Sequence, residues 1–279
     1  MITELLPALP LLLQSPFSSH PIRVLLLLLA GRPIPSATDS GASAVRSKRS
    51  EKYAQQNANF KPVVENAGET DEQAKEALRV PAALRAELAK FWRTVRFEIS
   101  PVEIRALGVG NVSGPVLQML IELEAAGGEA DEDGSLLDSC LCGLVAASRT
   151  GDAPKPERQD YVEHLLRDQA GSHLLEALLL HSPPRIFDLL WSTYFTGRLG
   201  KLGVHPVGNY VVAKGVRRLD GDQLGRLLDE SADWGRAVKR SRLGVISAVV
   251  NRSAELGVHG QAVLTVRLPG LVASSYICR

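Results

Sequence analysis

The chain of 279 residues is 45% hydrophobic and 23% charged, an ordinary globular composition with enough apolar side chains for a sizeable core. Only 5% of the residues are aromatic, and leucine and alanine are abundant, so helices are favoured over an all-β fold. The formal net charge of +1 offers no overall electrostatic argument for binding nucleic acid.

The N-terminal segment predicts two apolar helices, at 2–13 and 20–30, separated by QSPFSS. The run IRVLLLLLA at 22–30 is also similar to the apolar part of a secretory signal or to a membrane segment. It is too short to cross a bilayer, and the first 14 residues carry Glu4 but no Lys or Arg, unlike a signal peptide. We therefore interpret the run as a buried helix.

Residues 31–61 are rich in Ser, Gly and Pro, then basic in RSKRSEK and then polar, which predicts a flexible linker. The basic run is compatible with a nuclear-targeting patch as well as with solvated linker charge. Helical spacing resumes from about residue 71, with Pro81 as a break. In SPVE, we expect Ser100 to cap a helix that begins at Pro101, with Glu103 closing a capping box.

Two loops, GGEADEDGS at 127–135 and SRTGDAPKPERQ at 148–159, flank the stretch LLDSCLCGLVAA, which predicts one buried helix. Its Cys140 and Cys142 are expected to be reduced packing residues, because C-x-C alone is not a zinc site. Three cysteines without paired spacing also argue against a disulfide framework. Beyond residue 160 the chain predicts helices with short breaks at HSPPR, GVHPVG and DGDQ.

Five helix openings in the chain resemble one another, with a small or amide residue first and aliphatic residues third and fourth. They are SHPIRVLL from Ser19, GPVLQMLI from Gly114, SHLLEALL from Ser172, NYVVAKGV from Asn209 and GVISAVVN from Gly244. The third and fourth openings are 37 residues apart (209 − 172) and the last two are 35 apart (244 − 209), steps typical of α-helical repeats. The earlier steps of 58 and 95 residues require an insertion and the linker.

Positions one and five of each opening are four residues apart and therefore lie on the same face of a helix. Positions three and four point towards the core. Each repeat is thus expected to present two or three side chains on one exposed strip above an apolar floor.

This pattern resembles the PUF (Pumilio-type) RNA-binding repeats, whose second helix carries N-Y-x-x-Q or S-x-x-x-E at these places. The phrases FTGRLGKLGVHPVGNYVVAKGV, SPFSSHPIRVLLLLLAG and NVSGPVLQMLIELE are similar to the divergent, nucleolar protein nine branch of that family. The resemblance covers residues 1 to about 252 and is strongest over 160–220. Its most specific phrase is H-P-x-G-N-Y-V-V with a basic residue after it.

The resemblance implies an all-α fold, a right-handed superhelical solenoid of PUF-type helical repeats that binds RNA on its concave surface. The implied role is binding of precursor small-subunit (18S) ribosomal RNA in pre-ribosomal particles, in the nucleolus of the nucleus. No catalysis, cofactor, metal, membrane or small-molecule substrate is implied. We divide the chain into a first repeat (1–35), a flexible insertion (36–75), further helical repeats (76–252) and an atypical C-terminal tail (253–279). The family implies more repeats than the five openings found.

By position, the resemblance also implies the RNA-contacting residues. Base edges would be read by Ser19 with Arg23, Gly114 with Gln118, Ser172 with Glu176, and Asn209. His20, His173 and Tyr210 would stack on bases, with Pro115 at that place in its repeat. An ionised Glu only accepts hydrogen bonds, which suits guanine, whereas Gln and Asn both donate and accept and Arg only donates.

The pattern is incomplete, and the charge around it is locally basic. Ala213 stands where the family has Gln, and Val245 and Ala248 leave the last repeat without a polar reader. We therefore expect partial reading of bases rather than one base per repeat. Between residues 185 and 226, seven basic residues, Lys214 among them, stand against three acidic ones, which favours phosphate contacts.

Two other interpretations are less favoured. A HEAT- or armadillo-like helical scaffold that binds a protein partner would share the helices and spacing, but would not need rings and polar residues at the helix openings. Asp168, Ser172 and His173 could suggest a hydrolase triad, but no G-x-S-x-G elbow or strand accompanies them. The three tryptophans, Trp92, Trp191 and Trp234, are expected to pack between helices.

Overall fold

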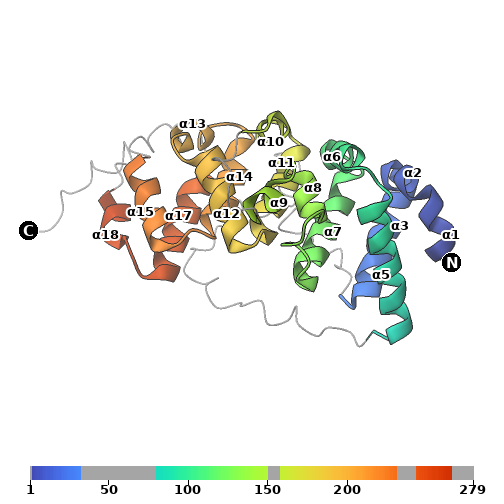
Figure 1. Cartoon of the computed structure of the whole chain (residues 1–279). Coiled ribbons are helices and arrows are strands. Elements are labelled where there is room, and N and C mark those ends of the chain that lie inside the picture. The colour runs from blue at the N-terminus through green and yellow to red at the C-terminus, as the bar shows by residue number, and fades with distance from the viewer. Residues whose placement is uncertain (1, 33–79, 150–157, 231–242, 266–279) are drawn as a thin grey trace, which may run out of the picture.

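The computed structural model describes residues 2–32, 80–149, 158–230 and 243–265, and every regular element in these ranges is helical. The helices form an elongated row that follows the order of the chain, with the N-terminal helices at one end and the C-terminal helices at the other (Figure 1). The prediction of helices throughout is confirmed for the described residues.

The described helices fall into five successive units, and in the first four units a longer second helix follows a shorter segment. The first unit holds α1 (Ile2–Leu5), η1 (Leu6–Ala8), α2 (Leu9–Gln14), α3 (Pro16–Ala30) and α5 (Ala82–Phe97). The second holds α6 (Pro101–Val109), α7 (Gly114–Gly127), α8 (Leu136–Cys140) and α9 (Leu144–Arg149). The third holds α10 (Asp160–Leu165), α11 (Gly171–His181), α12 (Pro184–Leu190) and the π-helical turn η5 (Trp191–Phe195). The fourth holds α13 (Leu199–Leu202), α14 (Gly208–Val216) and α15 (Gly221–Glu230), and the fifth holds α17 (Leu243–Leu256) and α18 (Gly260–Thr265).

The five second helices, α3, α7, α11, α14 and α17, pack side by side in this order. In α7, α11 and α14 the apolar third and fourth positions form the floor between units, as predicted: Leu174 and Leu175 in α11 and Val211 in α14 are completely buried. In α3 the third position, Pro21, is exposed. Because the second helices pack against their neighbours in the row, the described part of the fold is held together by local contacts between units.

Hydrogen bonds between units repeat the same period. Arg218 Nη1 donates to the carbonyl oxygens of Leu179 (2.6 Å) and Ser182 (2.7 Å), 39 and 36 residues earlier, and completes the C-terminal end of α11. Gln223 Nε2 donates to Asp188 Oδ1 at 2.7 Å, across 35 residues. The spans of 36 and 35 residues match the 35- to 37-residue steps between helix openings, so the repeat holds in three dimensions as well as in the sequence.

Two local predictions differ in their outcome. The capping box is confirmed, because Ser100 and Glu103 exchange hydrogen bonds at the start of α6. The single helix predicted for LLDSCLCGLVAA is wrong: the chain turns between α8 and α9, where Cys142 and Gly143 have φ angles of 57° and 81°. The Asp138 carboxylate accepts a hydrogen bond from Val145 N at 2.8 Å, which satisfies the start of α9 after the turn.

The ends of the row also differ from the expected bounds. The break predicted between the N-terminal helices shrinks to Ser15, because Pro16 starts α3 at a position where its missing N–H costs nothing. The boundary expected at residue 252 falls inside α17, and α18 packs against that helix. The basic run RSKRSEK, Trp234 and Cys278 lie outside the described residues.

In the described ranges, no single helix has both the length and the apolar character needed to cross a membrane. The bent pair of α6 and α7, which turns by 120°, passes that test only when the two helices are taken together.

Candidate nucleic-acid interface

The first position of each of the four leading openings is buried. Ser19, Ser172 and Asn209 are 4%, 0% and 2% exposed, and Gly114 is buried as well. The predicted edge readers at this position therefore belong to the packing between the helix opening and the loop before it.

Hydrogen bonds to the backbone satisfy the three polar side chains. Ser19 Oγ donates to Val112 O at 2.9 Å, in the loop between α6 and α7 of the second unit. Ser172 Oγ donates to Gln169 O at 3.1 Å. Asn209 Nδ2 donates to His205 O at 2.6 Å and to Pro206 O at 3.1 Å. These side chains hold the turn that precedes each second helix, and their role in reading bases stays a prediction.

The second position is the accessible one. His20 is exposed, the His173 side chain is 38% exposed and Tyr210 is 39% exposed. Pro115 takes this place in α7 and is half-buried. We call the side chains at positions two and five of the second helices the second-helix strip. Since α11 and α14 are neighbours in the row, His173 and Tyr210 are the two rings that adjacent units present together.

The fifth position supplies polar groups beside the rings. Arg23 and Gln118 are half-buried, and Arg23 Nη2 lies 3.5 Å from His20 Nδ1. The Glu176 side chain is 11% exposed, and its Oε1 lies 3.9 Å from His173 Nδ1. Each pair comes from one helix and sits on one face, because residues three apart on a helix are neighbours.

The fifth unit does not follow the register expected from the sequence. Val245 and Ala248, the expected strip residues, are 2% and 7% exposed. In α14 the exposed Tyr210 precedes two buried residues, and in α17 the exposed Ser247 does the same. Burial therefore aligns Ser247 with Tyr210 at a step of 37 residues (247 − 210), equal to the step between α11 and α14. The fifth unit places Ser247 and the exposed Val250 on the strip.

The basic residues between 185 and 226 include two groups with different surroundings. Arg198 pairs with Glu163 through both guanidinium nitrogens, and Arg185 and Arg218 donate to backbone carbonyls of other helices. These arginines hold units together. Among the described residues, no side-chain hydrogen bond or ion pair is found for the half-buried Lys214 and the exposed Arg217. Lys214 directly follows position five of α14.

Sequence reasoning missed one residue that shapes this surface. His205 Nδ1 accepts hydrogen bonds from Val207 N (3.2 Å) and Gly208 N (3.0 Å) at the start of α14. Asp168, 37 residues earlier (205 − 168), does the same for α11 through Gly171 N at 2.6 Å. The phrase H-P-x-G contained the signal, because a side-chain acceptor three residues before the glycine recurs in both units.

The described part of the chain holds no cluster of three or more His, Cys, Asp or Glu side chains that could bind a metal. Cys140 is fully buried in α8, and burial raises the pKa of its thiol. Trp191 stacks against Phe195 with ring centroids 4.8 Å apart and is buried, which confirms its role in packing.

Comparisons with known proteins agree with the resemblance. The sequence matches the family model described as the NOP9-like PUF repeat domain over residues 1–268. It is 30% identical to nucleolar protein 9 of Yarrowia lipolytica over 246 residues, which are 87% of this chain and 31% of that protein. It is also 30% identical to nucleolar protein 9 of Coccidioides posadasii, over 89% of this chain and 32% of that protein. The chain thus spans about a third of the length of these relatives.

The fold has counterparts among solved structures. The structure of APUM23-GGAUUUGACGG aligns with a TM-score of 0.65 and 17% identity, over 92% of this chain and 42% of that chain. The structure of APUM23-GGAAUUGACGG aligns with a TM-score of 0.61 and 18% identity. With the family match, these likenesses confirm the predicted right-handed superhelical solenoid of PUF-type repeats.

Proposed function

The chain belongs to the NOP9-like PUF repeat family, and from this premise we propose that it binds single-stranded RNA along the second-helix strip. The observation that carries the proposal is the ordered packing of the second helices, which brings His173 and Tyr210 onto adjacent units with both rings accessible. Stacking on aromatic side chains contributes about 1–3 kcal/mol per base in comparable sites.

Reading of base edges would rest on position five. The Glu176 carboxylate only accepts hydrogen bonds, so it suits a base edge with adjacent N–H donors, such as that of guanine. Gln118 both donates and accepts, and Arg23 only donates. Because Ala213 offers no polar group beside Tyr210, that unit would stack a base without reading it through this position.

Phosphate contacts would come from the cations beside the strip. Lys214 lies one residue beyond position five of α14, and Arg217 is exposed at the end of the same helix. Such contacts add affinity for any sequence, and they weaken with salt.

We propose precursor small-subunit (18S) ribosomal RNA as the target, in pre-ribosomal particles of the nucleolus, because the curated relatives are named nucleolar protein 9. The names of the two solved structures contain oligonucleotide sequences with uracil, which is in keeping with an RNA ligand for this fold. The proposal is one of binding without catalysis. The HEAT- or armadillo-like scaffold is not favoured, because the family match covers residues 1–268.

The test measures fluorescence anisotropy of labelled GGAUUUGACGG RNA, and of segments of precursor 18S RNA, at 50 and 200 mM salt. Affinity should fall with salt, and Tyr210→Ala should raise the Kd about 5- to 150-fold, the equivalent of one lost stack. Glu176→Gln should weaken binding most for segments that contain guanine. Phe97→Ala, a change at an exposed ring on α5 that is not part of the strip, is the matched control.

Binding that is equal for Tyr210→Ala, His173→Ala and the unchanged chain would contradict the proposed strip. Absence of binding to every RNA segment by a chain that circular dichroism shows to be folded would contradict RNA binding itself.

A further inference from the structure

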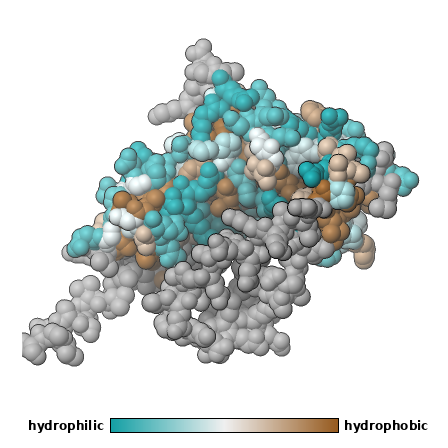
Figure 2. Space-filling model, turned by 90° about the horizontal axis from the view of Figure 1, so that it is seen from below, coloured by the Kyte–Doolittle hydropathy of each residue, from teal (hydrophilic) through white to brown (hydrophobic). Residues whose placement is uncertain are grey.

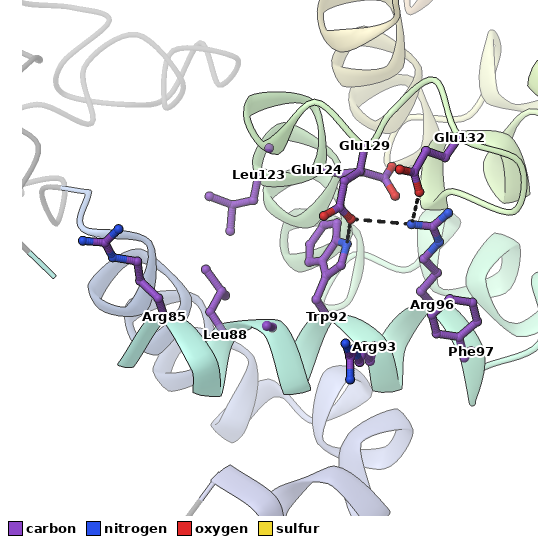
Figure 3. A pocket seen from close by; sticks show the side chains of 12 residues that line it. Arg85, Leu88, Trp92, Arg93, Arg96, Phe97, Leu123, Glu124, Glu129 and Glu132 are labelled. Atoms are coloured by element: carbon purple, nitrogen blue, oxygen red, sulfur yellow. Dashed lines mark hydrogen bonds and ion pairs between the residues drawn. The ribbon is translucent and has the colours of Figure 1, made fainter. Parts of the chain in front are cut away.

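A second surface lies away from the second-helix strip, on α5. A cleft of about 410 Å³ runs between α5, the C-terminal end of α7 and the loop after α7 (Figure 3). Seen from below, hydrophilic residues make up much of the coloured face, and hydrophobic residues lie in patches among them (Figure 2). Because α5 belongs to the first unit, the cleft lies towards the N-terminal end of the row (Figure 1).

The floor of the cleft is apolar. Leu88 and Trp92 are four residues apart on α5 and line the cleft on one side, and Leu123 of α7 lines it on the other. Leu84, one turn before Leu88, is 43% exposed and continues the same stripe. An i, i+4, i+8 stripe of this kind is the surface that a helix offers to another helix.

The acidic rim of the cleft is already paired within the chain. Arg96 Nη1 lies 2.9 Å from Glu132 Oε2 and 3.5 Å from Glu129 Oε2. Trp92 Nε1 donates to the same Glu129 carboxylate at 3.1 Å, which fixes the indole ring over the floor (Figure 3). These carboxylates therefore have cations and donors of their own.

The opposite rim carries two arginines that pair with no carboxylate among the described residues. Arg93 is exposed, and no hydrogen bond or ion pair to its side chain is found in that part of the chain. Arg85 is exposed, and the hydrogen bonds of its guanidinium to described residues go to the Val80 carbonyl, at 3.1 and 3.2 Å. The two arginines are eight residues apart on α5, which places them about 12 Å apart along the helix axis.

We propose that this cleft docks an amphipathic helix of a protein partner, with apolar side chains on the floor and two carboxylates about two turns apart facing Arg85 and Arg93. Carboxylates seven or eight residues apart on a helix span about 10–12 Å, which matches the spacing of the arginines. RNA is the less favoured occupant, because a phosphate chain has no apolar side chains to cover the floor formed by Leu88 and Leu123. The surface is separate from the proposed RNA strip, so the chain could hold both ligands.

The probe is a fluorescein-labelled, helix-forming peptide of 14 residues, with two glutamates seven positions apart, two leucines between them on the same face, and alanine and glutamine elsewhere. A second peptide carries lysines in place of the glutamates. The full chain should bind the glutamate peptide at least five-fold more tightly than the lysine peptide, in anisotropy titrations at 100 mM salt.

Variants separate docking from loss of the fold. Arg93→Glu should weaken the glutamate peptide about five-fold or more and strengthen the lysine peptide, a reversal that an unfolded chain would not give. Leu88→Asp should weaken both peptides. Tyr210→Ala, which is expected to weaken RNA binding, should leave the binding of both peptides unchanged.

Equal affinity for the two peptides, or an Arg93→Glu variant that binds both as the unchanged chain does, would overturn the proposal. If single-stranded RNA competes with the glutamate peptide, and if this competition is lost in Arg93→Glu but kept in Tyr210→Ala, the cleft is an RNA site instead.

Discussion

The buried carboxyl of Glu124 allows a quantitative prediction about stability. Its side chain is 1% exposed in α7, and its two oxygens accept hydrogen bonds from Leu136 N (2.8 Å) and Leu137 N (3.0 Å) at the start of α8. Burial raises the pKa of Glu124 from 4.5 to about 7, against the opposing effect of the two backbone N–H groups. The folded chain therefore keeps a proton there that the unfolded chain has lost.

The sign of the effect follows from proton binding. Between pH 4.5 and about 7 the folded state binds more protons at this site, so the free energy of unfolding falls as pH rises. At about 1.4 kcal/mol per pH unit, the loss over this window is about 3 kcal/mol, and it is complete above pH 7. Glu124→Gln keeps the shape and cannot titrate, so the difference in unfolding free energy between the variant and the unchanged chain should shift by that amount.

The assay is urea denaturation followed by far-ultraviolet circular dichroism, at half-unit steps from pH 4.5 to 8. The exposed Glu98 supplies the matched control, Glu98→Gln, whose profile should run parallel to that of the unchanged chain. Parallel profiles for Glu124→Gln and the unchanged chain would refute the reasoning, because they would mean that Glu124 titrates alike in both states.

Two further predictions concern packing between units. A Cβ added at Gly215 would collide with Cζ3 of Trp191 and lie 3.1 Å from its Cε3, so Gly215→Ala should destabilise the chain by about 1–3 kcal/mol despite the better helix propensity of alanine. In Gly200→Ala, where the added Cβ would have no atom within 4 Å, thermal denaturation should show no loss of stability. Arg218→Met should cost about 2 kcal/mol or more, because buried carbonyl oxygens at the end of α11 lose their donor, whereas the exposed Arg217→Met should stay within about 0.5 kcal/mol. If Arg218→Met and Arg217→Met had the same midpoint of thermal denaturation, the role of the Arg218 side chain in joining two units would be contradicted.

The sequence predicted the features that depend on local pattern. The 37-residue step, the buried third and fourth positions of α7, α11 and α14, and the capping box at Ser100 all follow from spacing within one helix or one repeat. The exposure of Tyr210 followed in the same way, because position two lies at a fixed angle from the apolar floor.

What the sequence could not supply depends on the loops before the helices. The burial of Asn209 arises from the turn at His205, whose carbonyl and imidazole bind the helix start, and no periodicity reports such bonds. The register of α17 was missed for a related reason: the small residue Gly244 matched the opening pattern, whereas the burial of Val245 shows that the strip begins later. The burial of Glu124 could not be predicted from local pattern, because its partners are backbone groups 12 and 13 residues away.

The hydrogen bonds of Arg218 give the row of units a direction. They run from the fourth unit to carbonyls at the end of α11 in the third, and Arg252 Nε likewise reaches back to Leu219 O at 2.8 Å. A unit in this half of the chain thus relies on its successor to complete its own second helix. Local unfolding in this half should therefore spread more readily towards the N-terminus than away from it. Removing a unit from the C-terminal side should destabilise the remaining units more than removing one from the N-terminal side.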